Sequence, residues 1–246
     1  MVTIHIIGDS TAANKEANKR PEHGWGECLH MFLKDSIRVK NYAKNGESSK
    51  SFKERGLFEA AKKHFKAGDY LIIQFGHNDS KIIDPEKYTI PLDTYQTYLK
   101  YYVDSAKQLG VIPIIFSSIS RRYFISEKVL EKNTVGAYPD AAMHFAKNHG
   151  IIHIDMYRYT YQLYGYLNDS VSRKMFMHLL PNTYENYPDG LTDNTHLNGY
   201  GAKVIASLVA EHLLQSRQTK VLHPYILKDK LLRKIDVKRT LNAKRL

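Results

Sequence analysis

The sequence predicts an α/β domain in which a parallel sheet of five strands lies between two layers of helices. Three observations lead to this prediction. Short apolar runs recur along the chain, segments with helical periodicity separate them, and Gly, Asp, Asn or Pro bounds each run. With 246 residues, of which 43% are hydrophobic, the chain is long enough to bury the core of one such domain.

The five apolar runs are the predicted strands, at residues 3–7, 37–42, 70–75, 112–117 and 151–155. The clearest helical pattern spans residues 92–109, where apolar side chains recur every three or four residues and Gly110 supplies the stop. A last helix is predicted over residues 199–214. Because strands and helices alternate, we expect parallel strands, with ligands bound beyond their carboxyl ends.

Residues 157–187 carry seven tyrosines and no clean strand pattern. We expect a helical hairpin there, with its loops on the ligand-binding side of the domain. Most of the tyrosines are expected to pack under a loop, although a tyrosine ring also suits stacking on a sugar.

The net charge of +11 is concentrated near the C-terminal end. Residues 217–246 hold ten Lys/Arg and two Asp/Glu, which gives +8 and leaves +3 for the rest, so we divide the chain into a domain, 1–216, and a basic tail, 217–246. The spacing of Leu227, Leu231 and Ile235 predicts a short amphipathic helix in the tail. We expect the tail to dock on its own domain or on a partner subunit of a homo-oligomer, rather than on a membrane or a nucleic acid.

Composition and motifs argue against several classes of protein. Cys28 is the only cysteine, so no disulfide framework or cysteine-based zinc site can form, and its place in a helical pattern at 25–33 argues against a thiol nucleophile. No run approaches the roughly 18 apolar residues of a membrane span. No leader-like stretch precedes Gly8, which predicts a cytoplasmic protein unless a signal was removed. Neither a His-Glu-x-x-His metal motif nor a complete phosphate loop occurs.

Ser10 directly follows the first predicted strand, in Gly8-Asp9-Ser10. Its hydroxyl is therefore expected at a carboxyl edge, where small neighbours let a substrate approach. Gly, Asp and Ser are also common in turns and helix caps, and the triplet taken alone fits a cap better.

The stretch from Asp193 to His196 precedes the last predicted helix, and its spacing lets one loop carry a base and the carboxylate that orients it. The imidazole can then take the Ser10 proton and return it to a leaving alcohol. The chain has 12 histidines, so His196 is distinguished only by its place beside Asp193.

Two further segments follow the second and third predicted strands. Gly46 lies in Asn45-Gly46-Glu47-Ser48, where the absent side chain lets a backbone N–H approach a ligand. Asn78 lies in Gly76-His77-Asn78-Asp79, and its amide suits donation to a developing oxyanion, an interaction worth about 3–4 kcal/mol in the transition state. An ordinary loop glycine and a simple turn are the competing interpretations.

Arg121 and Arg122 follow the fourth predicted strand. An arginine fork at this edge is suited to hold a carboxylate of the substrate in a bidentate manner. A structural or surface ion pair fits the two residues equally well.

Together, the four segments around Ser10, Gly46, Asn78 and His196 resemble, in order and in place, the signature blocks of the SGNH (GDSL) hydrolases. The resemblance covers roughly residues 3–215. It implies a three-layer, flavodoxin-like fold and an acyl transfer without metal or organic cofactor. It also implies that Ser10, Gly46 and Asn78 donate to the oxyanion, while Asp193 supports His196.

Further matches at Gly24-Trp25-Gly26, 45–52, 75–79, Arg121-Arg122 and 187–202 make the chain similar to the rhamnogalacturonan acetylesterase branch. This implies hydrolysis of O-acetyl groups on galacturonosyl residues through an acetyl-Ser10 intermediate, with an acetylated acidic oligosaccharide as substrate. The chain departs from the branch at Ala137, where an acidic residue is expected. In a cytoplasmic protein the substrate would be imported fragments rather than intact pectin.

Two alternatives remain open at this point. The four segments indicate acyl transfer but do not identify the group from which the acyl group is removed. Acetylated xylan, a lysophospholipid or a thioester is therefore also a possible substrate. A protein that binds carbohydrate or nucleic acid on this fold without catalysis is the second alternative, against which the complete set of site residues argues.

Overall fold

The computed structural model describes residues 2–243, and its centre is a five-stranded sheet with the order β3-β1-β4-β5-β8. The strands are β1 (Val2–Gly8), β3 (Ile37–Asn41), β4 (Tyr70–Gln74), β5 (Ile112–Phe116) and β8 (Ile152–Ile154). Every neighbouring pair is parallel. The predicted fold class is therefore confirmed, and the strand order is the flavodoxin-like one.

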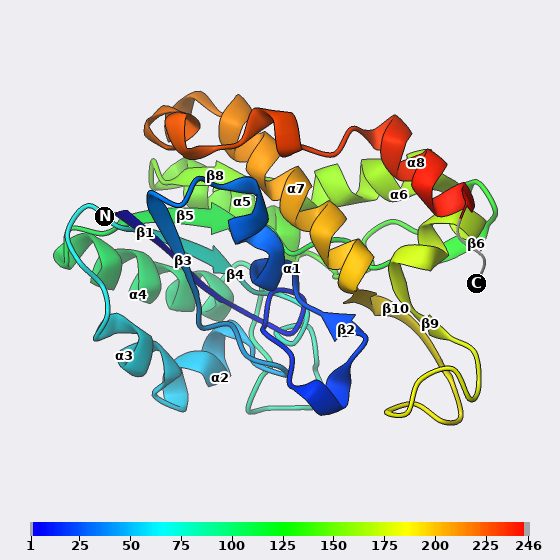
Figure 1. Ribbon diagram of the computed structural model, residues 1–246. Coiled ribbons are helices and arrows are strands. Elements are labelled where there is room, and N and C mark those ends of the chain that lie inside the picture. Colours follow the sequence, from blue (N-terminus) through cyan, green and yellow to red (C-terminus); the bar gives the residue numbers. More distant parts are fainter. Residues whose placement is uncertain (1, 244–246) are drawn as a thin grey trace.

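Helices cover both faces of this sheet (Figure 1). One face carries α1 (Trp25–Cys28), α6 (Met156–Ser172) and α7 (Gly199–Gln215), and the other carries α2 (Ser49–Glu54), α3 (Leu57–Lys62), α4 (Thr94–Gln108) and α5 (Tyr138–Asn148). Because side chains alternate along a strand, Ile72 packs into the first layer while Leu71 and Ile73 pack into the second. The strands β1, β4 and β5 are mostly apolar because both of their faces are buried, whereas the edge strand β3 exposes Arg38 and Lys40.

The two predicted helices form close to their expected bounds. Helix α4 buries Tyr95, Leu99 and Tyr102 on one stripe and ends before Gly110, whose φ of +70° suits a helix C-terminus. Helix α7 is buried on more than one side, because the sheet lies beneath it and the C-terminal tail covers it. The short segments elsewhere are η1 (Ala17–Lys19), η2 (Leu29–Phe32) and the hairpin of β6 (Phe124–Ser126) and β7 (Val129–Leu130).

The helical hairpin expected over residues 157–187 is wrong. Only α6 and the short η3 (Arg173–Met175) are helical there, and the chain then enters β9 (Phe176–Leu179). Strand β9 pairs antiparallel with β10 (Leu191–Asn198), which also pairs with β2 (Glu22–His23). The polar sequence of β10 shows no alternation of apolar residues, so pairing between distant segments decides its conformation.

Up to residue 243 the C-terminal tail packs onto its own domain, as the sequence predicted, and residues 244–246 of the predicted tail lie outside the described residues. It forms η4 (Arg217–Tyr225), η5 (Lys228–Lys230) and α8 (Lys234–Ala243), and it lies over α6 and α7 (Figure 1). The predicted helix through Leu227, Leu231 and Ile235 is wrong, because a break in the helical structure separates Leu231 from α8. The tail is anchored by a different set of buried side chains: Leu222, Ile226, Val237 and Leu241.

No helix within residues 2–243 is both long and apolar enough to cross a membrane.

Candidate active site

Ser10 lies at the carboxyl end of β1, in a tight turn that starts at Asp9. The backbone carbonyl of Asp9 accepts from the N–H groups of Ala12 and Ala13, at 3.2 and 3.1 Å. The Asp9 carboxylate accepts from the backbone N–H and the hydroxyl of Thr11, at 2.9 and 2.7 Å. Asp9 therefore fixes the turn from inside, and only 9% of Ser10 is exposed.

A chain of hydrogen bonds joins Ser10 to His196 and Asp193. The Ser10 hydroxyl lies 3.0 Å from Nε2 of His196, and Nδ1 of His196 lies 2.7 Å from Oδ2 of Asp193. The other carboxylate oxygen of Asp193 accepts the backbone N–H groups of Thr195 and His196, at 2.6 and 2.9 Å. The three residues come from opposite ends of the chain, and the fold places them in line.

The protonation state of Asp193 suits this line of hydrogen bonds. Burial opposes ionisation of the carboxyl, but the hydrogen bonds from the His196 ring and from the two backbone N–H groups outweigh it and lower the pKa of Asp193 to about 2. An ionised Asp193 accepts from Nδ1–H, so Nε2 of His196 is left to accept the Ser10 proton.

An irregular stretch of β10 presents Asp193 and His196. The pairing register of β10 with β9 shifts between Thr192 and Leu197, so the residues between them leave the regular ladder. Immediately afterwards, the side chain of Asn198 accepts the N–H of Gly201 at 3.0 Å and caps α7. The pairing with β9 on one side and the capped start of α7 on the other hold this irregular stretch of β10 in place.

The segments with Gly46 and Asn78 lie beside Ser10, because β3 and β4 flank β1 in the sheet. Gly46 has φ of +77°, and apart from its chain neighbours no residue comes within 4 Å of where a Cβ would stand, so the space on that side of its Cα is open. The amide of Asn78 donates to the Glu47 carbonyl at 2.9 Å, which leaves its second hydrogen for a ligand. This bond ties the Asn78 side chain to the loop of Gly46.

Asp79 anchors the same region, although no pattern in the sequence distinguishes it. Its carboxyl is fully buried and accepts from the backbone N–H and hydroxyl of Ser49, at the start of α2, and from the hydroxyl of Thr89. Burial raises the pKa of Asp79 to about 7, against the lowering effect of these donors. Its place beside Asn78 was the only signal in the sequence.

Arg121 and Arg122 do not form the expected fork. Arg122 is buried and makes an ion pair with Asp169, and its Nη2 donates to Oδ1 of Asn194 at 2.7 Å. It therefore supports the stretch of β10 that carries Asp193 and is not available to a substrate, which corrects the prediction for this residue.

Arg121 remains partly exposed. It donates from Nε to Nδ1 of His77 at 3.3 Å, and His77 donates from Nε2 to the Ile119 carbonyl at 3.0 Å. Burial lowers the pKa of His77 to about 4, so the ring is neutral and can make both contacts. Arg121 thus lies against the residue that precedes Asn78.

Two cavities border these segments. One has a volume of about 340 Å³ and lies along β9 and β10, where Asn198 and Gly199 follow His196 closely. Its lining combines aromatic, apolar and polar side chains, among them Phe176, His178, Tyr184 and Tyr200. The second has about 310 Å³ and is lined by Asn45, Glu47 and nearby charged residues. Both volumes are sufficient for a small ligand.

Known proteins are similar to this chain over most of its length. The rhamnogalacturonan acetylesterase RhgT of Bacillus subtilis (strain 168) is 38% identical over 210 residues, which are 85% of this chain and 88% of that protein. The rhamnogalacturonan acetylesterase of Emericella nidulans is 28% identical over 222 residues, 83% of this chain and 81% of that one.

Solved structures share the fold. The YxiM protein of Bacillus subtilis superimposes with a TM-score of 0.74 and 22% identity, over 87% of this chain and 56% of that chain. An acetylxylan esterase from Geobacillus stearothermophilus gives a TM-score of 0.56 and 16% identity, over 86% and 94%. The model of the GDSL-like lipases and acylhydrolases matches residues 4–209. The resemblance to the SGNH hydrolases is confirmed, and the chain belongs to the GDSL-like lipase/acylhydrolase family.

Proposed function

We propose that this protein is a serine esterase that removes O-acetyl groups from carbohydrate. The observation that carries the proposal is the hydrogen-bonded line from the Ser10 hydroxyl through His196 to the ionised Asp193. An aligned base raises the nucleophilicity of a serine, and the family name of lipases and acylhydrolases denotes the same chemistry.

The reaction follows from these contacts in two halves. Nε2 of His196 takes the Ser10 proton while Oγ attacks the acetyl carbonyl. The N–H groups of Ser10 and Gly46 and the amide of Asn78 donate hydrogen bonds to the negative charge that develops on the carbonyl oxygen. The imidazolium then gives its proton to the sugar oxygen, which leaves as an alcohol, and acetyl-Ser10 remains. A water molecule activated by His196 releases acetate in the second half.

For the substrate, we propose acetylated galacturonosyl residues of rhamnogalacturonan oligosaccharides. Support comes from the relatives named as rhamnogalacturonan acetylesterases, which match this chain over most of both lengths. The cavity along β10 adds to this support. Asn198 and Gly199, which follow His196 in sequence, line this cavity together with Tyr184, and an aromatic ring in a cavity wall suits a sugar.

The first experiment measures acetate release from acetylated rhamnogalacturonan oligosaccharides, acetylated xylan and an aryl acetate, with wild type and Ser10→Ala in parallel. The proposal predicts a preference of wild type for the pectic substrate and a loss of at least about 10³-fold in kcat for the variant. Turnover of the aryl acetate without a preference for the pectic substrate would support the esterase activity and reject the proposed substrate. An inactive wild type, or an equally active variant, rejects the serine mechanism.

A further inference from the structure

The ammonium of Lys15 is buried beneath the loops of the candidate active site. The side chain is 0% exposed, and its Nζ has three close partners. It donates to the Ser10 carbonyl at 2.6 Å and to Oδ1 of Asn45 at 2.6 Å, and it forms an ion pair with Glu22 at 2.7 Å. Three acceptors match the three hydrogens of an ammonium, so the buried charge is fully satisfied.

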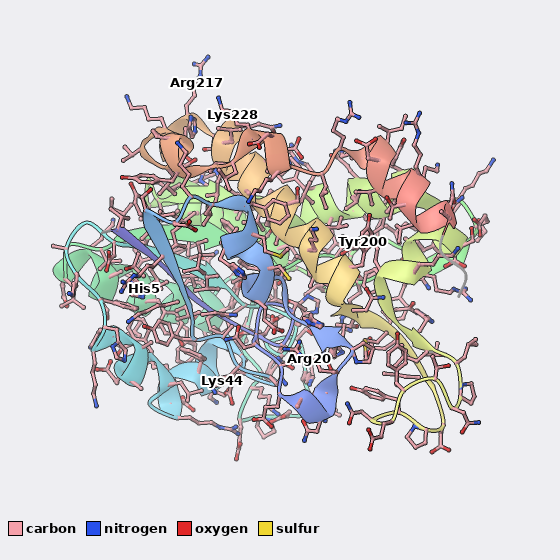
Figure 2. All side chains as sticks on the ribbon, in the orientation of Figure 1. His5, Arg20, Lys44, Tyr200, Arg217 and Lys228 are labelled. Atoms are coloured by element: carbon pink, nitrogen blue, oxygen red, sulfur yellow. The ribbon has the colours of Figure 1, made fainter. Side chains whose placement is uncertain are left out.

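Each of these acceptors belongs to a different part of the site. Ser10 carries the nucleophile, and Asn45 directly precedes Gly46. Glu22 lies in β2, where it pairs with Asn198 of β10, two residues beyond His196. In Figure 2, Arg20, two residues before Glu22, and Lys44, directly before Asn45, mark where these two acceptors lie along the ribbon. A single cation therefore joins the nucleophile turn, the Gly46 loop and the strand pair that holds the histidine.

The backbone of Lys15 is fixed as well. Its N–H donates to Oε1 of Glu27 at 3.1 Å, and the same oxygen accepts the N–H of Gly24 at 3.0 Å. Arg20 forms an ion pair with the other carboxylate oxygen of Glu27 at 2.9 Å. Lys15 is therefore held at both ends, and its ammonium cannot follow one loop without displacing the others.

We propose that Lys15 is a positioning residue for acyl transfer, an inference that rests on the proposed esterase function. Lys15 sets the Ser10 turn against the Gly46 loop, so it fixes the spacing of two N–H groups that would donate hydrogen bonds to the oxyanion. That spacing matters more in the transition state than in the bound ester, because the negative charge develops only there. Loss of Lys15 is thus expected to lower kcat while KM changes little.

The test compares Lys15→Met with Lys63→Met, which makes the same change of charge and length at an exposed lysine directly after α3 and serves as the control. Steady-state kinetics with an aryl acetate are expected to show a fall in kcat of at least about 30-fold for Lys15→Met, with KM within twofold of wild type. The control is expected to match wild type. A folded Lys15→Met that keeps kcat within twofold of wild type overturns the proposal. A variant in which KM changes by a comparable factor while kcat stays unchanged overturns it as well.

A second pair of variants covers the case in which Lys15→Met does not fold. Asn45 is exposed, so Asn45→Ala removes one partner of Lys15 with little effect on the core, whereas Asn45→Asp retains an oxygen acceptor. We expect a severalfold fall in kcat for Asn45→Ala and near wild-type kcat for Asn45→Asp. Equal kcat values in these two variants contradict the proposal. Ser10→Ala, assayed alongside, reports separately on the esterase mechanism.

Discussion

At the residue scale, the partners of a charged side chain decide what it can do. Arg121 and Arg122 are neighbours in sequence, yet Arg122 is buried in an ion pair with Asp169 while Arg121 lies partly exposed against His77. Their adjacency predicted that both would bind the same substrate carboxylate. Nothing in the sequence indicates that Arg122 contacts Asp169, 47 residues away. Only Arg121 is left as a candidate for the carboxylate of an acidic sugar.

Arg121→Ala is expected to raise KM for acetylated galacturonosyl oligosaccharides about tenfold, because a charge-assisted hydrogen bond to the uronate is lost. KM and kcat for an aryl acetate, which has no carboxylate, are expected to stay within twofold. Initial-rate kinetics on both substrates measure the difference, with Arg38→Ala at an exposed position of β3 as the control. Equal losses on both substrates would show that Arg121 acts through His77 and not on the sugar.

At the scale of elements, the sheet carries the site because three adjacent strands end at one edge. Strands β3, β1 and β4 lead to Gly46, Ser10 and Asn78, and these strands were predicted from short apolar runs alone. Strand β10, which leads to His196, was not predicted, since its residues are polar and only pairing with β2 and β9 makes them a strand. Asp79 joins the end of β4 to the start of α2.

Asp79 also makes stability depend on pH. Its pKa is raised by burial to about 7 in the folded protein, above the ordinary value of about 3.9, so the folded state holds the proton more tightly than the unfolded state. The associated stability is complete below about pH 4 and is lost as the pH rises towards 7. Asp79→Asn is expected to remove this part of the pH dependence.

The measurement is the free energy of unfolding by urea between pH 4.5 and 8, for wild type, Asp79→Asn and the control Asp35→Asn in an exposed turn. The wild type and the control should share the decline with rising pH, whereas Asp79→Asn should show less of it. An identical slope in all three proteins would mean that Asp79 titrates as in the unfolded chain.

At the scale of the whole molecule, the basic tail is part of the folded core. Leu222, Ile226, Val237 and Leu241 are buried in the same cluster as α6 and α7. The charge of the tail predicted a separate segment, and its sparse apolar residues predicted docking, but not which of them make the contact. A homo-oligomer through the tail stays a prediction, to be tested by the mass of the protein in solution.

Leu241→Ala is expected to lower the free energy of unfolding by about 2–5 kcal/mol, because the fully buried side chain leaves a cavity between the tail and the domain. Ile235→Ala, at a side chain that is 48% exposed, is the control and should change it by less than about 1 kcal/mol. Urea unfolding measures both variants. A Leu241→Ala protein as stable as its control would indicate that the tail is not anchored in solution.

The sequence by itself determined the alternation of strands and helices, the parallel sheet and the four segments of the candidate site. These features depend on the local periodicity of apolar residues, on glycines at turns and helix ends, and on the chain direction at strand ends. All of these are visible over short stretches of sequence. The tertiary structure decided the pairing of β9 with β10, the burial of Arg122 and Lys15, and the anchors of the tail. Their partners are distant in sequence, so neither burial nor pairing has a local signature.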